Sequence, residues 1–344
     1  MGRIAHPWLI AVFFGLSIAC AKGQSVRKAS ATGIFCLLAA DRVERPFPDL
    51  ASEPCWTNPN VQGVSLRSNW DKIEPSDGKF DWTFFDEGVR LAAQHHKKIS
   101  MSITAGVTTP AWVYAAGAYR WDINRLRRTG GADPLSQPLP WDSVFQAKWS
   151  EFIRAFGARY DNVSELVYVV MGGPGRKAEG FFVNSPADIA RLESMGGLSR
   201  WVQGSEKIVD HYASAFSKTP FILAMGPPIP GAAGQAALSQ LIDYASQQYS
   251  GHFGVMSDGL RPAYALSSIG ARTVRALSSR QPVGFQMLIP SKGGMLMSEG
   301  SLEDALNRGV ALGAHFLEVY AADCRDPNQA AVLQRVGAKL SASY

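Results

Sequence analysis

The stretch Trp-Asp-Lys-Ile-Glu-Pro-Ser-Asp-Gly-Lys-Phe-Asp-Trp-Thr-Phe-Phe-Asp, residues 70–86, decides how this chain is interpreted. An apolar run that ends at Arg67 precedes it, and an amphipathic helical pattern and a second apolar run, Ile99–Ala105, follow it. This order of strand, loop, helix and strand is the repeating unit of a parallel α/β fold. The loop carries two tryptophans and several carboxylates at the carboxyl end of a strand, where such folds place their ligands.

Eight short apolar runs can be found along the chain, each followed by a loop and a helical pattern. Runs rich in Val, Ile, Leu and Phe suit parallel strands that are buried on both faces. The runs are Gly33–Ala40, Gln62–Ser68, Ile99–Ala105, Leu166–Met171, Phe221–Gly226, Phe253–Ser257, Val283–Leu288 and Ala314–Tyr320. Eight strand–helix alternations without a break in composition predict an α/β fold, a closed (β/α)8 TIM barrel in one domain.

The loops after the third and fourth strands are expected to be long, over residues 106–140 and 172–197, and to shape a cleft on one face of the barrel. An open doubly wound sheet is the alternative architecture. It is disfavoured because no Gly-x-Gly-x-x-Gly turn follows the first apolar run.

The composition is that of a well-packed globular protein: of 344 residues, 46% are hydrophobic and 18% are charged, and the formal net charge is +5. The basic residues are scattered, apart from Arg125-Leu126-Arg127-Arg128, so no nucleic-acid partner is expected. Histidines are too few and too dispersed for a metal site, and no Gly-x-Ser-x-Gly nucleophile elbow is present. Neither a metal nor a cofactor is therefore expected.

The N-terminus has the features of an export signal. A weakly basic start and the apolar run Trp8–Ile18 precede Ala19-Cys20-Ala21, which fits a small-x-small cleavage site. The run is too short to span a membrane comfortably, so no integral span is expected after cleavage. Cleavage after Ala21 is favoured over a lipoprotein anchor on Cys20, because Ser17 stands where such signals usually have a branched aliphatic residue. A signal peptide over residues 1–23 and a secreted or periplasmic barrel over residues 24–344 are predicted.

Cleavage would leave three cysteines, which lack the spacing of a zinc or redox motif. One bridge and one buried thiol are a natural arrangement in an oxidising compartment. Cys36 lies within the first apolar run and is expected in the core. Cys55 and Cys324 follow the first and last strands, which become neighbours when a barrel closes, so a Cys55–Cys324 disulfide is predicted.

The motif Trp-x-x-Ile-Glu-Pro-x-x-Gly-x-Phe-Asp-Trp resembles the segment after the second strand of barrel glycoside hydrolases. The resemblance is strongest to the β-galactosidase-like and xylanase-like families of their largest clan. Thr109-Pro110-Ala111-Trp112 resembles the Thr-Pro-x-Trp that follows the third strand of β-galactosidase-like enzymes. Within the first segment, Glu74 is expected to fix the loop rather than to bind a ligand. The specific likeness covers residues 33–114, and elsewhere the similarity is architectural, which alone does not license a function.

The resemblance implies an acid/base glutamate at the end of strand four and a nucleophilic glutamate at the end of strand seven. Strand four instead leads into a glycine-rich turn with no carboxylate before Glu179, and strand seven carries Gln286, which cannot form a glycosyl ester. Glu318 lies inside the eighth apolar run, where a carboxylate is costly unless it faces a pocket or a partner. Glu179 is therefore predicted as the acid/base and Glu318 as the nucleophile or stabiliser. The alternatives are a solvated loop residue for Glu179, and a buried partner of Arg67 or a helix residue for Glu318.

Arg67, at the end of strand two, resembles the arginine that hydrogen-bonds the nucleophile in members of the clan. Trp70 and Trp112 are expected to stack on a sugar ring, with loop anchoring as the alternative. Further contacts to sugar hydroxyls are expected from side chains at other strand ends, namely Asp258, Gln286, Tyr320 and Asp323. The predicted function is hydrolysis of O-glycosidic bonds in a carbohydrate by a carboxylate pair. The alternative is a catalytically inactive sugar-binding TIM barrel, because missing glutamates at strands four and seven are what such a loss would leave behind.

Overall fold

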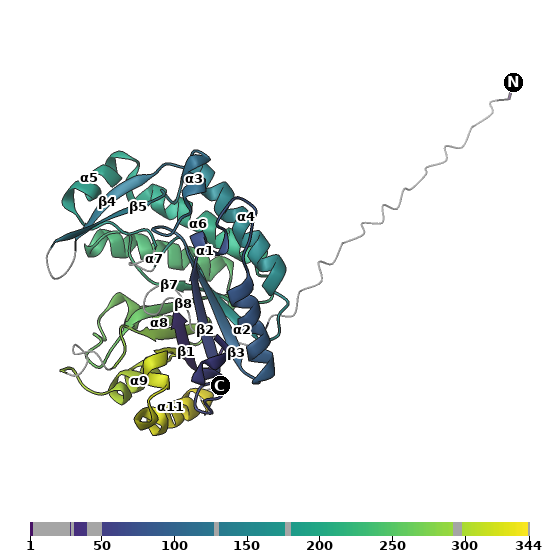
Figure 1. Cartoon of the computed structure of the whole chain (residues 1–344). Helices are drawn as coiled ribbons and strands as arrows, with labels where there is room; N and C mark the ends of the chain where they lie inside the picture. Colours follow the sequence, from purple (N-terminus) through teal and green to yellow (C-terminus); the bar gives the residue numbers. More distant parts are fainter. Residues whose placement is uncertain are drawn as a thin grey trace.

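The computed structural model describes residues 1–2, 28, 31–39, 50–126, 131–175, 180–291 and 298–342, with the side chains of Ala39 and Asp133 excepted. Eight parallel strands close into a barrel, and helices surround it (Figure 1). In order around the barrel the strands are β1 (Gly33–Ala39), β2 (Gly63–Asn69), β3 (Lys98–Thr104), β6 (Leu166–Val170), β7 (Phe221–Ala224), β8 (Phe253–Leu260), β9 (Val283–Met287) and β10 (Phe316–Tyr320). The predicted (β/α)8 TIM barrel is confirmed, and each predicted apolar run overlaps one barrel strand.

The helices pack around the strands through their apolar faces, as α4 illustrates: its aromatic side chains recur at helical spacing and are all buried. The helices are α1 (Trp70–Ile73), α2 (Thr83–Gln94), α3 (Ala111–Ala115), α4 (Ser143–Tyr160), α5 (Pro186–Ser194), α6 (Gly197–Ala215), α7 (Gly231–Gln248), α8 (Ile269–Leu277), α9 (Leu302–Ala311), α10 (Ala321–Cys324) and α11 (Ala330–Ala342), with 3-10 turns η1 (Leu50–Ser52), η2 (Pro54–Trp56) and η3 (Pro327–Gln329). Among the described helices, none has the length and apolar character that a membrane crossing needs.

The barrel interior is filled near the amino ends of its strands by three aromatic rings, which we call the aromatic floor. Tyr168 lies between Phe35 and Phe316, with ring centroids 5.4 and 4.4 Å away. Two glycines make room for the rings: a Cβ on Gly63 would lie 2.5 Å from Phe35, and one on Gly284 would lie 2.4 Å from Phe316. The floor therefore closes one end of the interior.

One part of the fold was not anticipated. The expected long loop after β3 contains an antiparallel hairpin of β4 (Trp121–Leu126) and β5 (Ala132–Gln137), which lies beside α5 at the far end of the molecule from α11 (Figure 1). Trp121 and Ile123 are buried while Asp122 and Asn124 are exposed, so the hairpin packs through one face only.

Candidate functional site

Polar side chains occupy alternate positions of β2 and β3, and we call this group the polar stripe. Its register pairs are Ser65 with Ser100, Arg67 with Ser102, and Asn69 with Thr104, and all six residues are buried. Residues two apart in a strand share a face, and the apolar residues between them belong to the outer core under the helices. Ser100 Oγ donates to Ser65 Oγ (2.9 Å), and Thr104 Oγ1 donates to Asn69 Oδ1 (2.7 Å). The stripe runs from the barrel interior to the mouth at the carboxyl ends of the strands.

Arg67 and Gln286 are bonded across the barrel interior. The Arg67 guanidinium donates through Nη2 to Gln286 Oε1, and both side chains are buried. Strands β1 and β10 lie between β2 and β9, so this Arg67–Gln286 bridge joins strands that are not neighbours. The contact is the one that the resemblance implies between the clan arginine and its nucleophile, with an amide in place of the carboxylate.

Glu318 points from β10 into the barrel, next to Gln286 in the register, and is only 1% exposed. Its Oε1 accepts hydrogen bonds from Ser65 Oγ (2.7 Å) and from the Tyr168 hydroxyl (2.8 Å). Burial, and then the negative charge of Glu318, raise the pKa of Tyr168 well above its ordinary value, so the phenol keeps its proton and acts as the donor. The carboxylate therefore faces the interior, as expected of a candidate site residue, but lies deep in it and directly against the aromatic floor.

A small hollow lies at the mouth, between the end of β3 and the turn that follows β6. Its lining comprises Ser102, Thr104, Ala105, Met171, Gly172, Gly173, Pro174, Gly175 and Gly180. Two side chains of the polar stripe reach it. The turn lies close against β3, since a Cβ on Gly172 would lie 2.3 Å from the carbonyl oxygen of Ile103. Glu179, the predicted acid/base, belongs to this turn but lies outside the described residues.

Trp70 is not available to a sugar, which corrects the expectation for this residue. Its side chain is completely buried, with ring centroids 4.7 Å from Trp149 and 5.9 Å from Trp112. Its indole N–H donates to Glu74 Oε2 (2.8 Å), and Glu74 Oε1 accepts from the backbone N–H of Gly78 (2.8 Å). The physical reason is that Trp70 begins α1 and turns under the loop, so Trp70 and Glu74 anchor the loop from inside.

Trp112 lies nearer the surface than Trp70. It is half-buried, its indole N–H donates to the backbone oxygen of Glu74 (2.9 Å), and the Lys148 ammonium lies 6.0 Å from its ring centroid. Part of the ring can therefore meet a ligand, and sugar stacking on Trp112 stays a prediction.

Other side chains at the mouth lie at strand ends. Asp258, near the end of β8, and Tyr320, the last residue of β10, are both half-buried, and the Tyr320 hydroxyl donates to Leu288 O (3.4 Å). Their contacts with a sugar stay predictions. Asp323 is buried and accepts from the backbone N–H and the hydroxyl of Ser291, which fixes the chain after β9. The sequence suggested contact with sugar hydroxyls for Asp323, and that contact stays a prediction.

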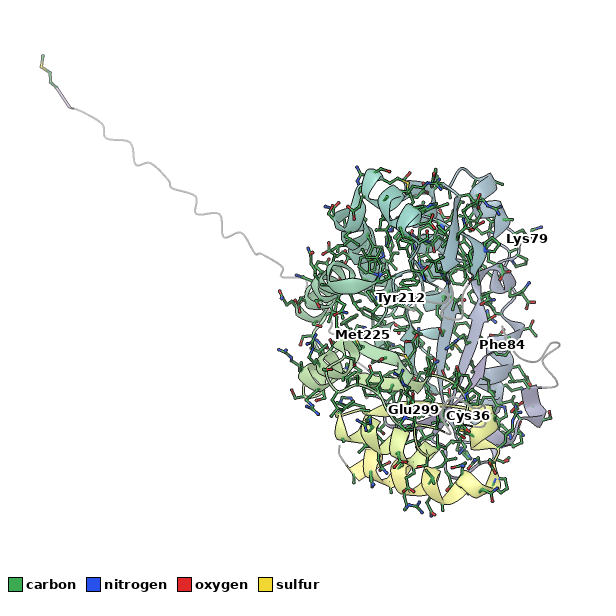
Figure 2. The ribbon with its side chains drawn as sticks, turned by 90° about the vertical axis from the view of Figure 1, so that its left-hand side faces the viewer. Cys36, Lys79, Phe84, Tyr212, Met225 and Glu299 are labelled. Atoms are coloured by element: carbon green, nitrogen blue, oxygen red, sulfur yellow. A yellow bond between two sulfur atoms is a disulfide. The ribbon has the colours of Figure 1, made fainter. Side chains whose placement is uncertain are left out.

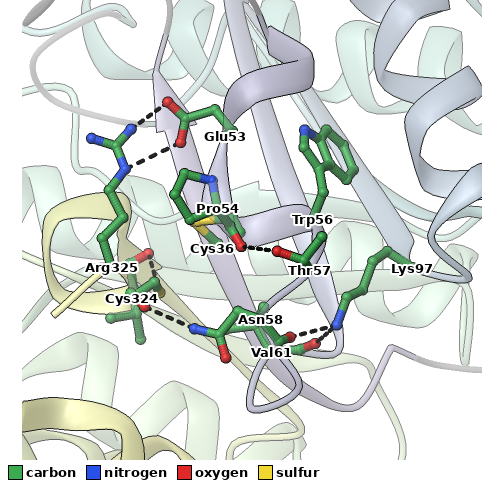
Figure 3. The surroundings of a disulfide bond; sticks show 12 residues. Cys36, Glu53, Pro54, Trp56, Thr57, Asn58, Val61, Lys97, Cys324 and Arg325 are labelled. Carbon is green, nitrogen blue, oxygen red and sulfur yellow. Dashed lines mark hydrogen bonds and ion pairs between the residues drawn. A yellow bond between two sulfur atoms is a disulfide. The ribbon is translucent and has the colours of Figure 1, made fainter. Parts of the chain in front are cut away.

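The disulfide pairing differs from the predicted one. Cys36 and Cys55 are bonded, and Cys324 is a buried free thiol, so the Cys55–Cys324 prediction is wrong (Figure 3). Cys36 lies in the outer core rather than with the aromatic floor, and η2 folds back over this outer side of β1. The Cα atoms of Cys36 and Cys55 are consequently 6.2 Å apart. Figure 2 shows Cys36 beside the C-terminal segment, drawn in yellow.

Comparison with known proteins gives a family match over part of the chain. The family model described as β-galactosidase matches residues 57–172, which run from before β2 to the start of the turn after β6. Two curated relatives are 44% identical over 54 residues, 14% of this chain: β-galactosidase BgaB of Geobacillus sp. (strain Y412MC61) and β-galactosidase bgaB of Geobacillus kaustophilus. The match covers 8% of the length of these relatives, so the chain spans only a small part of them.

Solved structures of glycosidases share the fold. The catalytic domain of β-amylase from Paenibacillus polymyxa has a TM-score of 0.59 at 11% identity, covering 90% of this chain and 98% of that one. β-Galactosidase from the psychrophilic Marinomonas ef1 has a TM-score of 0.58 at 9% identity, covering 90% and 59%. At such identities the likeness shows the TIM barrel. The family match includes residues 70–82 and confirms the resemblance that their sequence indicated.

Proposed function

We propose that this chain, a divergent TIM barrel of the glycoside hydrolase clan, acts on O-glycosidic bonds of a carbohydrate at the mouth where the polar stripe ends. The observation that carries the proposal is the position of the family match. Residues 57–172 supply the whole polar stripe, Trp112 and the β3 side of the hollow. The part of the chain that is most similar to β-galactosidases is thus the part that builds the β2–β3 side of the candidate site.

The groups at the mouth are of the kinds that bind sugars. Hydroxyl and amide side chains of the polar stripe can exchange hydrogen bonds with sugar hydroxyls, and the half-buried Trp112 offers an aromatic surface to the apolar face of a sugar ring. Asp258 and Tyr320 would add contacts from the opposite wall.

Hydrolysis needs two carboxyl groups on either side of the scissile bond. We assign Glu179 as the acid/base and Glu318 as the nucleophile or stabiliser. Because Glu318 lies within the barrel beside the Arg67–Gln286 bridge, this assignment requires the bridge to open when substrate binds. Arg67 would then orient the Glu318 carboxylate, and Gln286 would bond a sugar hydroxyl.

A sugar-binding barrel without catalysis is the second candidate function, and two observations favour it. Gln286 accepts the hydrogen bond from Arg67 at the place where the resemblance implies a nucleophilic glutamate. Glu318, the carboxylate next to Gln286 in the register, is 1% exposed and already bonded to Ser65 and Tyr168. An amide at the nucleophile position leaves a site that can hold a sugar but cannot form a glycosyl ester.

Turnover and binding assays separate the two functions. The full chain is incubated with aryl glycosides, aryl β-galactosides first, and with polysaccharides, while binding is followed by calorimetry. Hydrolysis that falls by about 100-fold or more in Glu179→Gln and Glu318→Gln supports the first candidate. Glu87→Gln, which changes a half-buried carboxylate on α2 that pairs with Arg90, is the matched control. Full activity in both variants refutes the carboxylate pair, and binding without turnover supports the second candidate.

The variant Gln286→Glu separates the two candidate functions by a gain of activity rather than by a loss. In a barrel that lost its nucleophile, the change returns a carboxylate beside Arg67 and should create turnover where there was none. In an enzyme that uses Glu318, it places a second carboxylate in register with the first and should lower kcat, because two adjacent charges hinder each other's ionisation.

We also propose that the chain is exported, with cleavage after Ala21. The segment in question lies outside the described residues, apart from residues 1–2. The support is the order of basic start, apolar run and small residues, together with a disulfide, which is typical of oxidising compartments. Intact mass measurement of the protein recovered from a secreting bacterial host tests this. A mass that still includes residues 1–21 would contradict it.

A further inference from the structure

Three cysteine sulfurs lie together beside the seam of the barrel, the line along which β1 and β10 pair. The Sγ atoms of Cys36, Cys55 and Cys324 lie within 4.8 Å of one another, and all three residues are buried. Two of them form the disulfide, and the third is a thiol whose Sγ lies 3.6 Å from Val319 O. Thiol–disulfide exchange requires an attacking sulfur within reach of a disulfide sulfur, and this trio satisfies that requirement.

Contacts on both sides of Cys55 hold its segment against that of Cys324 (Figure 3). The Arg325 guanidinium donates to both carboxylate oxygens of Glu53, on one side of Cys55. Asn58 Nδ2 donates to the backbone oxygen of Cys324 (2.8 Å) on the other side. The ion pair and the hydrogen bond keep the two cysteine segments in place whichever sulfurs are bonded.

We propose that the three cysteines form one exchangeable unit, in which the disulfide moves between Cys36–Cys55 and Cys55–Cys324. Cys324 loses its proton, and its thiolate attacks Sγ of Cys55. The new S–S bond forms as the Cys36–Cys55 bond breaks, and the electron pair leaves on the sulfur of Cys36, which takes up a proton. One disulfide and one thiol are present before and after the step, so no oxidant or reductant is consumed.

The exchange changes which side of the seam is linked to η2 by the disulfide. In one pairing η2 is bonded to β1, and in the other it is bonded to α10, directly after β10. Cys36 lies in the middle of β1 with strands paired on both sides, so its backbone stays fixed in either state. The unit is therefore a rearrangeable cross-link of the seam rather than a fixed one.

The reaction should be slow near neutral pH. Burial, and then the nearby Asp323 carboxylate, raise the pKa of the Cys324 thiol far above its ordinary value, while Arg325, itself paired to Glu53, acts in the opposite direction. Because the thiolate is the attacking species, the rate should increase with pH.

A metal ion fits the trio less well than exchange does. Three thiolates around a soft monovalent ion such as Cu(I) would carry a net charge of −2 among buried apolar side chains. The adjacent Arg325 is already paired with Glu53. Exchange keeps the unit neutral apart from the transient thiolate.

Mapping the free thiol of the folded protein tests the proposal. The full chain, in a Cys20→Ser background that removes the fourth cysteine, is held at about pH 9, where the thiolate fraction is raised. Samples taken over time are quenched in acid, unfolded, alkylated with a maleimide and analysed by peptide mass mapping. Alkylation is expected first on Cys324 and then increasingly on Cys36. Alkylation that stays on Cys324 alone for a full day overturns the proposal, and so does its appearance on Cys55.

Single variants give a second measurement that does not depend on rate. Cys36→Ser, oxidised in the folded state, is expected to contain a Cys55–Cys324 disulfide, and Cys324→Ser should retain Cys36–Cys55. Cys55→Ser, which removes the shared partner, should leave two free thiols. Two free thiols in folded Cys36→Ser contradict the exchange. Should Cys36→Ser fail to fold, Cys36→Ala is the substitute, and the time course on the Cys20→Ser protein stands by itself.

Discussion

The clearest test of the internal loop anchor is Trp70→Phe. The substitution keeps a ring among the buried aromatic side chains but removes the indole N–H that donates to Glu74 Oε2 at 2.8 Å. A lost hydrogen bond to a charged group costs about 1.5–3 kcal/mol. The smaller ring adds a packing loss that is well below the roughly 3–5 kcal/mol of a Trp→Ala change. We therefore expect Trp70→Phe to lower the free energy of unfolding by about 3 kcal/mol near neutral pH.

The loss should also depend on pH. Burial raises the pKa of the Glu74 carboxyl above its ordinary value, and the bond from Trp70 partly offsets this. A carboxyl whose pKa is higher in the folded state contributes less stability as pH rises from its unfolded pKa to its folded pKa. Without the indole donor the folded pKa rises further, so the variant should lose more stability toward higher pH and approach the parent at acidic pH.

Urea unfolding followed by far-UV circular dichroism at several pH values measures both effects. Trp112→Phe is the matched control, because it also removes an indole N–H, but one that donates to the neutral backbone oxygen of Glu74. Its cost should be about 1 kcal/mol and independent of pH. If the two variants lose equal stability, or if Trp70→Phe abolishes sugar binding with unchanged stability, the anchoring role of Trp70 is refuted.

Two further predictions concern the turn at the mouth and the base of the barrel. Gly175→Ala should cost about 2 kcal/mol more than Gly131→Ala, because overpacking adds to the backbone strain. Both glycines have φ 77°, but a Cβ on Gly175 would lie 2.1 Å from Ala224 O, while one on Gly131 meets nothing within 4 Å. Equal losses of stability in urea unfolding would argue against overpacking at Gly175. Lys28 donates to Thr219 Oγ1, and burial lowers its pKa from 10.5 to about 8. The folded protein then binds fewer protons at this amine than the unfolded chain does, so stability should rise with pH across that interval. Thermal melts of the parent and Lys28→Met should diverge there, and parallel curves would contradict the lowered pKa of Lys28.

The barrel could be predicted because parallel strands with both faces covered appear in a sequence as short, uninterrupted apolar runs. The hairpin after β3 could not. Its alternation of buried Trp121 and Ile123 with exposed Asp122 and Asn124 is too short to stand out from a loop. Its place beside α5 depends on tertiary contacts that sequence order does not reveal.

The candidate site was predicted in part, and the misses have one physical cause. Sequence order indicates which strands are neighbours but not which side of a strand a residue uses or how deep it lies. The inward orientation of Glu318 followed from the cost of burying a carboxylate, yet its depth did not. Cys36 was recognised as buried, but not as lying on the same outer side as Cys55. Ser100 and Ser102 are polar residues two positions apart within an apolar run. This period-two pattern indicates that they share a face of the strand, but it was not used in the prediction.

The pairing of β1 with β10 has a consequence for biosynthesis. Gly33 pairs with Phe316 and Cys36 with Val319, so the strand made early acquires its second neighbour only when nearly all of the described chain has left the ribosome. Helix α11, made later still, packs against β1 as well. Until then the apolar outer side of β1 stays uncovered on the nascent polypeptide. We expect this polypeptide to depend on chaperones that hold it open until its two ends can meet.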